Sequence, residues 1–556
     1  MSNLPASTAD RAETHVDVVI VGAGFSGLYM LHRMRKLGFS TRVFETGGDV
    51  GGTWYWNRYP GARCDVASLE YSYSFDDDLQ QEWNWTEKYA TQPEILAYLN
   101  HVADRYDLRG GITFDTAVTG ARFDDEAGRW LVETSSGETV SARHLVMATG
   151  CLSASRVPDF PGLERFRGET YHTGRWPHEP VSFAGKRVGV IGTGSSAIQT
   201  IPMVAREARH LHVFQRTPTF SVPAQNRPLG RDEILAWKSA YPEKRHFARH
   251  VARTGWIPEP AIGKAVETAP DALRQEFEKR WATGGSNFLY AFSDLGVDEN
   301  ANRLAADFVR QKIRETVKDP VLAEKLIPWD YPIGTKRICV DTDYYATYNR
   351  DNVTLVDVRA APIEAITETG IRTADGEYEV DAIIFATGYD AMTGALTRLD
   401  LTGAKGARLA DKWDAGPTNY LGIMTTGFPN FFMITGPGSP SVLSNVVVSI
   451  EQHVEWLADL FDYMRAHGKD RIEPTREAEA AWVEHCRALA AATLQMKANS
   501  WYLGANVPGK PRVFLPYIGG TSVYRQKCDE VAAKGYEGFV LSSAPATGAS
   551  MDRKRA

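Results

Sequence analysis

Two short glycine-rich runs constrain the fold of this 556-residue chain more than any other feature. Each run lies between a short apolar segment (residues 16–21 and 187–191) and a segment whose apolar residues recur with helical spacing. Strand, glycine turn and helix in this order are typical of a dinucleotide-binding unit, because the glycines let the backbone approach a pyrophosphate whose charge rests on the helix N-terminus. The sequence therefore predicts an α/β protein with two Rossmann-like dinucleotide-binding domains. The residues of the two turns are Gly22, Gly24, Gly27, Gly192, Gly194, Ser195 and Ser196.

The two glycine turns differ in the residues that follow the second strand of each unit. In the first unit the strand-like segment 41–44 ends on Glu45, whose carboxylate can accept hydrogen bonds from ribose hydroxyls and would repel a 2′-phosphate. In the second unit, segment 211–214 is followed after one residue by Arg216 and Thr217, and an arginine beside the ribose pairs with a 2′-phosphate. The first turn therefore suits FAD or NAD, and the second is predicted to prefer NADPH.

Length and composition set further limits. A chain of 556 residues is too long for one core and predicts two or three domains. A net charge of −7 argues against a nucleic-acid partner, which requires a basic face. We expect no membrane partner, because no apolar run is long enough to span a bilayer and no signal-peptide core is found near the start. The five cysteines show no paired spacing, so we expect reduced thiols in a cytoplasmic protein, without disulfides or a metal site.

The pattern changes along the chain and suggests an order of domains. Residues 225–330 carry charged helical segments and no glycine fingerprint, whereas the end of the chain is small and polar. Two apolar segments that end on Ala-Thr-Gly, at 148–150 and 386–388, close the two nucleotide units. We therefore predict an FAD-binding domain (1–150 and 390–542), an NADP-binding domain (151–224 and 331–389), a helical insertion (225–330) and a disordered tail (543–556).

The stretch between the two nucleotide units carries the pattern F-x-G-x-x-x-H-x-x-x-W-P. Its defining residues are Phe166, Gly168, His172, Trp176 and Pro177. This pattern resembles the fingerprint of the type I Baeyer–Villiger monooxygenases, and the chain is similar to the phenylacetone and steroid monooxygenase group of that family over roughly residues 15–540. One neighbouring position departs from the family, because His178 stands where an aspartate is frequent. We expect the stretch to couple the two nucleotide domains rather than to take part in the chemistry.

Residues 51–65 are too aromatic and too rich in glycine for a helix or a regular strand. We interpret them as a loop held over a ligand. This loop also resembles the family, which carries G-x-W, then Y-P-G and an aspartate at this spacing. Its candidate cofactor contacts are Gly52, Thr53, Trp54 and Asp65.

The resemblance implies further site residues. The family's essential arginine falls on Arg337, its partner aspartate on Asp65 and a lysine that binds the 2′-phosphate on Lys336. Trp501 matches an aromatic residue that helps to hold the nicotinamide cofactor. Residues 436–445 resemble a loop on the substrate side, with Ser441, Val442 and Leu443 as the candidate contacts.

The resemblance also implies a reaction, in which FAD, NADPH and O₂ convert a ketone into an ester or a lactone through a peroxyflavin. Such an oxidant must be an anion to attack a carbonyl carbon. An arginine next to it supplies a permanent positive charge, because the guanidinium does not deprotonate. Preorganised charge of this kind commonly contributes about 10²–10³ in rate. The physical argument therefore supports Arg337 as the catalytic group and Asp65 as the residue that orients it.

Three other functions compete with this interpretation. A flavin-containing monooxygenase that oxidises amines or sulfides would use the same two nucleotide sites, but its motif ends without the Trp-Pro pair. A disulfide reductase with two dinucleotide sites needs a close pair of cysteines, which this chain lacks. A flavin-binding regulator would not consume NADPH and oxygen with a ketone. The sequence determines neither the ketone nor the oligomeric state, and it is compatible with a monomer.

Overall fold

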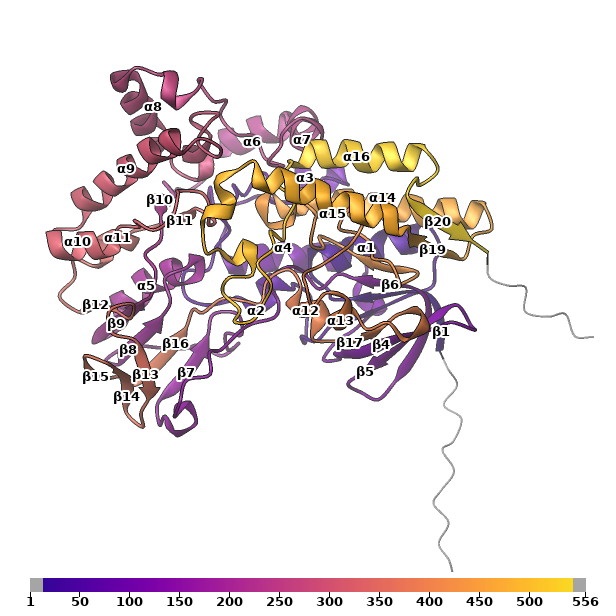
Figure 1. The fold of residues 1–556 in the computed structure, drawn as a ribbon, viewed down its shortest axis with the longest axis horizontal. Coiled ribbons are helices and arrows are strands. Elements are labelled where there is room, and N and C mark those ends of the chain that lie inside the picture. Colours follow the sequence, from indigo (N-terminus) through magenta and orange to yellow (C-terminus); the bar gives the residue numbers. More distant parts are fainter. Residues whose placement is uncertain (1–13, 544–556) are drawn as a thin grey trace, which may run out of the picture.

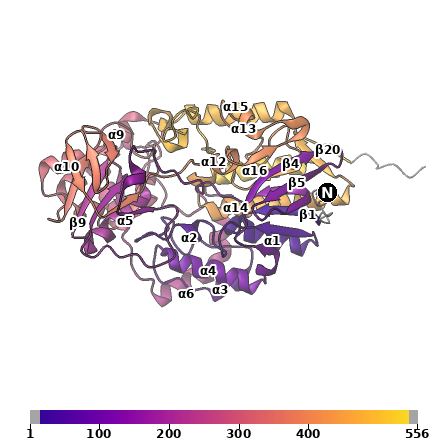
Figure 2. The same cartoon turned by 90° about the horizontal axis from the view of Figure 1, so that it is seen from below.

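The computed structural model describes residues 14–543, so only Ser543 of the predicted tail (543–556) lies inside the described part. Two sheets lie side by side, each with helices packed against it (Figures 1 and 2). This arrangement confirms the predicted α/β class. Within residues 14–543 no helix has the length and apolar character needed to cross a membrane, and no group of His, Cys, Asp or Glu side chains could hold a metal ion. The five cysteines are free thiols.

The larger sheet is built around β1 (Thr14–Val21), which pairs in parallel with β2 (Thr41–Phe44) and β6 (Thr139–Met147). Alternate residues of β1 enter two separate hydrophobic clusters, as expected for a strand covered on both faces. Helices α1 (Phe25–Lys36) and α14 (Val446–Ala466) cover one of these faces. The other strands of the sheet are β3 (Ile112–Thr113), β4 (Val118–Asp124), β5 (Arg129–Thr134), β17 (Asp400–Thr402) and β18 (Phe431–Met433).

The smaller sheet has five strands, and every neighbouring pair in it is parallel. Helix α5 (Ser195–Glu207) follows its central strand directly, as the second glycine pattern predicts. Parallel pairing brings the carboxyl ends of these strands to one edge, where ligands bind in sheets of this kind. In order across the sheet the strands are β12 (Val353–Asp357), β9 (His210–Gln215), β8 (Arg187–Ile191), β16 (Ala382–Phe385) and β7 (Glu169–His172).

The fingerprint stretch 166–177 forms part of this smaller sheet and is more than a connection between domains. Strand β7 pairs with β16 at the edge of the sheet, with His172 opposite Phe385. The strand has four residues and only His172 among them is buried, so it produces no alternating apolar pattern. The sequence therefore did not reveal this strand.

Residues 225–330 connect the two parts of the smaller sheet's unit through helices. Helix α7 packs against α16 (Thr521–Ala533), which ties this segment to the larger sheet's unit (Figure 1). Two short strands that flank the segment in the sequence, β10 (Ser221–Pro223) and β11 (Cys339–Asp341), pair in parallel with each other. The division into domains made from the sequence stays a prediction. The helices are α6 (Arg231–Ser239), α7 (Tyr241–His250), α8 (Pro270–Thr283), α9 (Glu299–Thr316) and α10 (Pro320–Leu326).

The loop 51–65 contains one element that was not expected. Residues Thr53–Trp56 form a single helical turn, α2, so the prediction of a loop without a helix was wrong for these residues. Trp54 is 7% exposed and packs into the core, and Gln92 donates a hydrogen bond to its carbonyl oxygen. This burial holds a turn that the aromatic and glycine composition alone would not favour.

In the first glycine turn, Gly27 lies very close to the backbone of Gly22, and this gives a testable expectation. A Cβ at Gly27 would collide with the carbonyl oxygen of Gly22, so Gly27→Ala should lower the free energy of unfolding by about 1–3 kcal/mol, the usual cost of overpacking. Gly296→Ala is the control, because a Cβ there meets open space and should change stability by less than about 0.5 kcal/mol. Thermal unfolding of both variants measures the difference. Equal stability of the two variants would contradict this account of the turn.

Candidate active site

The first glycine turn is shaped by backbone contacts and by Glu45. Gly22 has a φ of +105°, and a Cβ there would lie 2.7 Å from the carbonyl oxygen of Ala148. The Glu45 carboxylate, at the end of β2, accepts hydrogen bonds from the backbone N–H groups of Ala23 and Gly47, both at 2.7 Å. Burial raises the pKa of Glu45 although these hydrogen bonds oppose the shift. Glu45 therefore holds the turn in shape, a role additional to the predicted contact with a ribose.

The loop 51–65 lies directly against this turn. A Cβ at Gly24 would lie 3.3 Å from the Cα of Gly52, so the two glycines face each other across a narrow gap. Thr53 is exposed beside this gap. Trp54 points into the core instead, where its Nε1 donates to the hydroxyl of Tyr71 at 3.3 Å. The structure thus brings Gly52 and Thr53 to the first turn and gives Trp54 a packing role.

The second glycine turn leaves open space in front of a helix. Gly192 has a φ of +116°, and a Cβ there would lie 2.5 Å from the carbonyl oxygen of Ala386. A Cβ at Gly194, by contrast, would have no atom of the described chain within 4 Å. Helix α5 begins at Ser195 with no acidic residue in its first turn, and the first N–H groups of a helix have no partner within it. This space and these donors fit a phosphate group.

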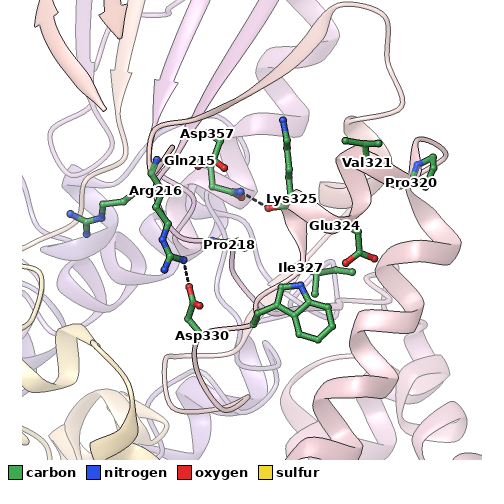
Figure 3. A pocket seen from close by; sticks show the side chains of 12 residues that line it. Gln215, Arg216, Pro218, Pro320, Val321, Glu324, Lys325, Ile327, Asp330 and Asp357 are labelled. Carbon is green, nitrogen blue, oxygen red and sulfur yellow. Dashed lines mark hydrogen bonds and ion pairs between the residues drawn. The ribbon is translucent and has the colours of Figure 1, made fainter. Parts of the chain in front are cut away.

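At the end of β9, the side chain of Gln215 is buried and that of the next residue, Arg216, is exposed. Gln215 is buried, and its amide donates to the carbonyl oxygen of Lys325 at 2.7 Å. Arg216 is exposed on the opposite side, as alternation along a strand requires. The carbonyl oxygen of Thr217 accepts a hydrogen bond from Thr193 at 2.7 Å. Arg216 lines a hollow of about 590 Å³, whose side chains are drawn in Figure 3.

Lys336 completes a cationic group with Arg216. Burial and the charge of Arg216 lower the pKa of Lys336 to about 8, and Asp330 opposes this shift weakly. The Lys336 ammonium also lies 4.4 Å from the centre of the Tyr331 ring. Two cations that repel each other form a group that an anionic phosphate would stabilise, and Arg216 alone of the two lines the hollow.

Arg337 and Asp65 form a bidentate ion pair between segments that are far apart in the sequence. Nε of Arg337 donates to Oδ2 of Asp65 at 2.6 Å, and Nη2 donates to Oδ1 at 2.7 Å. Nη1 donates to the carbonyl oxygen of Val442 at 2.7 Å. The side chains of Arg337 and Asp65 keep 28% and 21% of their exposure, so the pair is half-buried but reachable. Three of the predicted site residues therefore meet at one point.

The ion pair keeps both groups charged. Burial alone would raise the pKa of Asp65, but the charge and the hydrogen bonds of Arg337 outweigh it and hold the pKa below the usual value. For Arg337, burial opposes the charged form, but Asp65 raises its pKa well above the usual value. The guanidinium is therefore a fixed, permanent cation whose plane is set by the carboxylate.

An apolar wall lies next to this cation. Val442 and Trp501, both predicted from the sequence, belong to one cluster with Met392 and Leu515. Ser441 is fully buried beside them and its hydroxyl donates to the carbonyl oxygen of Ser439, whereas Leu443 is half-buried. The sequence did not predict the other members of the wall, which are Cys151, Leu152, Ala391, Met392 and Leu515. One signal was available, because Cys151 follows the first Ala-Thr-Gly turn directly.

The fingerprint residues contact both sheet units. His172 accepts a hydrogen bond from the N–H of Gly174 at Nδ1, and its Nε2 lies 3.2 Å from the carbonyl oxygen of Arg156. Burial lowers the pKa of His172, so its ring is neutral. The backbone N–H of Trp176 donates to Trp56 in the loop 51–65, at 3.3 Å. In the described chain no hydrogen bond joins His172 to the Arg337–Asp65 pair, in keeping with a role outside the chemistry.

The other fingerprint residues and Ser196 also have structural contacts. Phe166 packs at the edge of the smaller sheet's core, and a Cβ at Gly168 would collide with the carbonyl oxygen of Asp381. Pro177 is half-buried. Ser196 in the second turn lies 3.1 Å from the hydroxyl of Thr173, which follows β7. The fingerprint thereby reaches the second nucleotide turn.

Comparison with known proteins identifies the family. A family described as flavin-binding monooxygenase-like matches residues 15–226. A Baeyer–Villiger monooxygenase of Pseudooceanicola batsensis is 44% identical, over 97% of this chain and 98% of that protein. This chain belongs to the Baeyer–Villiger monooxygenase family. The family recognised from the fingerprint of residues 166–177 is thereby confirmed.

Two further relatives of this Baeyer–Villiger monooxygenase differ in their named substrates. The acetone monooxygenase (methyl acetate-forming) of Gordonia sp. (strain TY-5) is 44% identical, over 95% of this chain and 99% of that protein. A solved structure described as oxidized steroid monooxygenase bound to NADP is 53% identical, with a TM-score of 0.91 over 95% of this chain and 99% of that chain. These relatives support ketone oxygenation over the oxidation of amines or sulfides.

The lowered pKa of Lys336 predicts a pH dependence. A pKa of about 8 means that the ammonium is present at pH 7 and is lost as the pH rises to 9. Lys336 is the predicted contact of the 2′-phosphate, so on this assignment the KM for NADPH should rise by up to about tenfold between pH 7 and pH 9. Lys336→Ala should show a higher KM that is nearly independent of pH over this range. Steady-state kinetics at constant ionic strength provide the measurement, and identical pH profiles for the two proteins would contradict the assignment.

Proposed function

We propose that Arg337, oriented by Asp65, is the catalytic group of this Baeyer–Villiger monooxygenase, which uses FAD, NADPH and O₂ to convert a ketone into an ester or a lactone. The observation that carries the proposal is the bidentate pair, held in addition by the carbonyl oxygen of Val442. Bound FAD supplies the oxygen chemistry and NADPH supplies the electrons. The residues of the chain bind the cofactors and the ketone, orient them and provide charge.

Arg337 stabilises negative charge that develops on reacting oxygen atoms. Its guanidinium stays protonated at every accessible pH, and Asp65 fixes its plane. A charge that is oriented before the reaction needs no reorganisation during it, which is why such groups contribute strongly to rate. The adjoining wall around Val442 and Met392 limits access of water to this position.

We assign the two glycine turns to the two cofactors. The first turn, with Glu45 and the adjacent loop, is the proposed FAD site, and the second turn is the proposed NADPH site. Support for the second assignment comes from the open space over Gly194 and, separately, from Arg216 and Lys336, which are near enough for the charge of Arg216 to lower the pKa of Lys336. The proposed FAD contacts are Gly22, Gly24, Gly27, Glu45, Gly52, Thr53 and Asp65, whereas Trp54 packs in the core below them. The proposed NADPH contacts are Gly192, Gly194, Ser195, Ser196, Arg216, Thr217, Lys336 and Trp501.

The fingerprint stretch is proposed to couple the two nucleotide domains. It contributes a strand to the smaller sheet and donates from Trp176 to the loop at the first turn. Ser441, Val442 and Leu443 are proposed to face the ketone, since Val442 lies in the wall beside Arg337. The free cysteines fit a reducing compartment such as the cytoplasm, which we retain as the proposed location.

Replacement of Arg337 tests the proposal. Arg337→Ala should bind FAD, because the first glycine turn is untouched, and should lose ketone oxygenation by at least about a hundredfold. Residual NADPH oxidation should yield hydrogen peroxide and no ester. Arg337→Lys should rescue poorly, because an ammonium lacks the planar fork that Asp65 orients, and Asp65→Ala should show a milder form of the defect. The measurements are NADPH consumption and chromatography of the ester.

A matched control variant shows whether the loss of ketone oxygenation is specific to Arg337 or follows from the loss of any arginine–carboxylate pair. Arg187 also forms a bidentate pair, with Asp381, and its side chain is 33% exposed, close to the 28% of Arg337. Arg187→Ala should change ester formation by less than about twofold, because Arg187 lies at the amino end of β8, whereas ligands bind at the carboxyl ends of the strands in sheets of this kind. Ester formation at a near wild-type rate by Arg337→Ala would overturn the catalytic assignment.

Arg216 tests the assignment of the second turn. Arg216→Ala should raise the KM for NADPH by about tenfold or more, since a hydrogen bond to a charged group contributes about 1.5–3 kcal/mol. The KM for NADH should change far less, because NADH lacks the 2′-phosphate. Ester formation with each nicotinamide gives both constants. Equal effects on the two would show that Arg216 does not recognise the phosphate.

A further inference from the structure

A second hollow, of about 240 Å³, lies between α3 (Asp77–Glu82) and α7, away from both glycine turns. Helix α7 contributes four basic side chains to its lining, namely Arg245, His246, Arg249 and His250. Their spacing places them on one face of the helix. Figure 1 shows α7 between α6 and α16, with α3 close by, so the hollow lies where segment 225–330 meets the N-terminal part of the chain.

Arg245 is buried without an ion-pair partner, although the Glu70 carboxylate is near enough for the charge of Arg245 to act on its pKa. Arg245 is 8% exposed, and its three donor nitrogens bind neutral oxygens, the Gln80 amide at 3.0 Å, the Glu70 carbonyl at 2.9 Å and the Ser72 hydroxyl at 2.6 Å. In the described part of the chain no carboxylate lies within ion-pair distance of it. The Glu70 carboxylate accepts from the N–H of Ile257 instead, and burial raises its pKa to about 7.

Arg249 and Arg525 add buried donors that lack partners. Nη1 of Arg249 donates to the Ser74 hydroxyl at 3.1 Å and Nη2 pairs with Glu455, but its buried Nε has no hydrogen-bond partner. Arg525, 8% exposed, does not line the hollow, but the charge of Arg249 acts on it, and its Nε and Nη2 are buried without a partner. Its shortest contact to a carboxylate is 3.7 Å, to Glu455, which it shares with Arg249. Buried donors of this kind are rare because each costs free energy.

Although burial disfavours the charged form, two carboxylates, Glu451 and Glu455, act on Arg249 and raise its pKa, and Glu455 is shared with Arg525. Glu451 accepts from the N–H and the hydroxyl of Ser74, and burial raises its pKa, as it does for Asp529 near Arg525. Asp77 lines the hollow but is exposed at its rim. His246 and His250 are exposed residues of the lining, and their rings stack with centres 4.8 Å apart.

We propose that this hollow is a second ligand site, which binds a small phosphate-type oxyanion between α3 and α7. Its size suits a phosphate or a phosphate monoester, and arginine donors match the geometry of that group. None of its lining residues belongs to the glycine turns, to the Arg216–Lys336 group or to the Arg337–Asp65 pair. A bound oxyanion bridges segment 225–330 and the N-terminal part of the chain, and it therefore stabilises their contact.

The test is calorimetric titration of inorganic phosphate into the FAD-loaded protein at constant ionic strength. Saturating NADP⁺ is present throughout, because it occupies the proposed 2′-phosphate site. We expect one phosphate per chain, and Arg249→Gln should weaken its binding at least about tenfold, the usual loss for a charge-assisted contact. The double variant His246→Ala/His250→Ala, at the exposed rim, should weaken binding about threefold or more. Arg216→Ala should leave this phosphate bound.

The matched control is Lys244→Gln. Lys244 precedes Arg245 on the same helix but does not line the hollow, and its ammonium lies over the Trp237 ring. This variant removes the same charge and should bind phosphate as the wild type does. Absence of phosphate binding in the NADP⁺-saturated protein would overturn the proposal, as would equal weakening by Lys244→Gln or loss of binding in Arg216→Ala. If Arg249→Gln does not fold, the histidine double variant decides, and unchanged affinity there would overturn the proposal.

Discussion

The Arg337–Asp65 ion pair is the interaction on which the proposed catalytic site depends. Its partners are 272 positions apart in the sequence and meet because the loop after α2 lies against the segment that enters β11. A half-buried pair of this kind contributes little net stability, because desolvation offsets most of the attraction, whereas loss of one partner strands the other charge. Its value therefore lies in a cation of fixed position and orientation. The carbonyl oxygen of Val442 adds a third point of support.

The two nucleotide units share one construction behind this pair. In each, the Ala-Thr-Gly turn after a neighbouring strand presses against the glycine that begins the phosphate turn. A Cβ at Gly22 would lie 2.7 Å from the Ala148 oxygen, and a Cβ at Gly192 would lie 2.5 Å from the Ala386 oxygen. Parallel pairing of β1 with β6, and of β8 with β16, brings these turns to the same edge of each sheet. The repeated Ala-Thr-Gly motif therefore has a packing reason.

Two contacts between the units contain buried polar groups. The fingerprint stretch joins the smaller sheet to the loop at the first turn, and the buried His172 holds its bend. Helix α7 brings Arg245 and Arg249 against the first unit, and the Nε of Arg249 is buried without a hydrogen-bond partner. Buried polar groups cost free energy unless they are satisfied, so these contacts contribute less stability than apolar contacts of the same area would.

Local patterns in the sequence determined the glycine turns, most of the strands that precede them and the family, because backbone approach and alternation are properties of neighbouring residues. The cofactor preference inferred from Glu45 and Arg216 stays a prediction. Only the tertiary structure decided that Arg337, Asp65 and Val442 meet, and that Cys151, Met392 and Leu515 form the wall beside them. It also decided that α2 is helical and that β7 is a strand. Those features depend on packing between distant segments, and a short, partly exposed element carries no periodic signal of its partner.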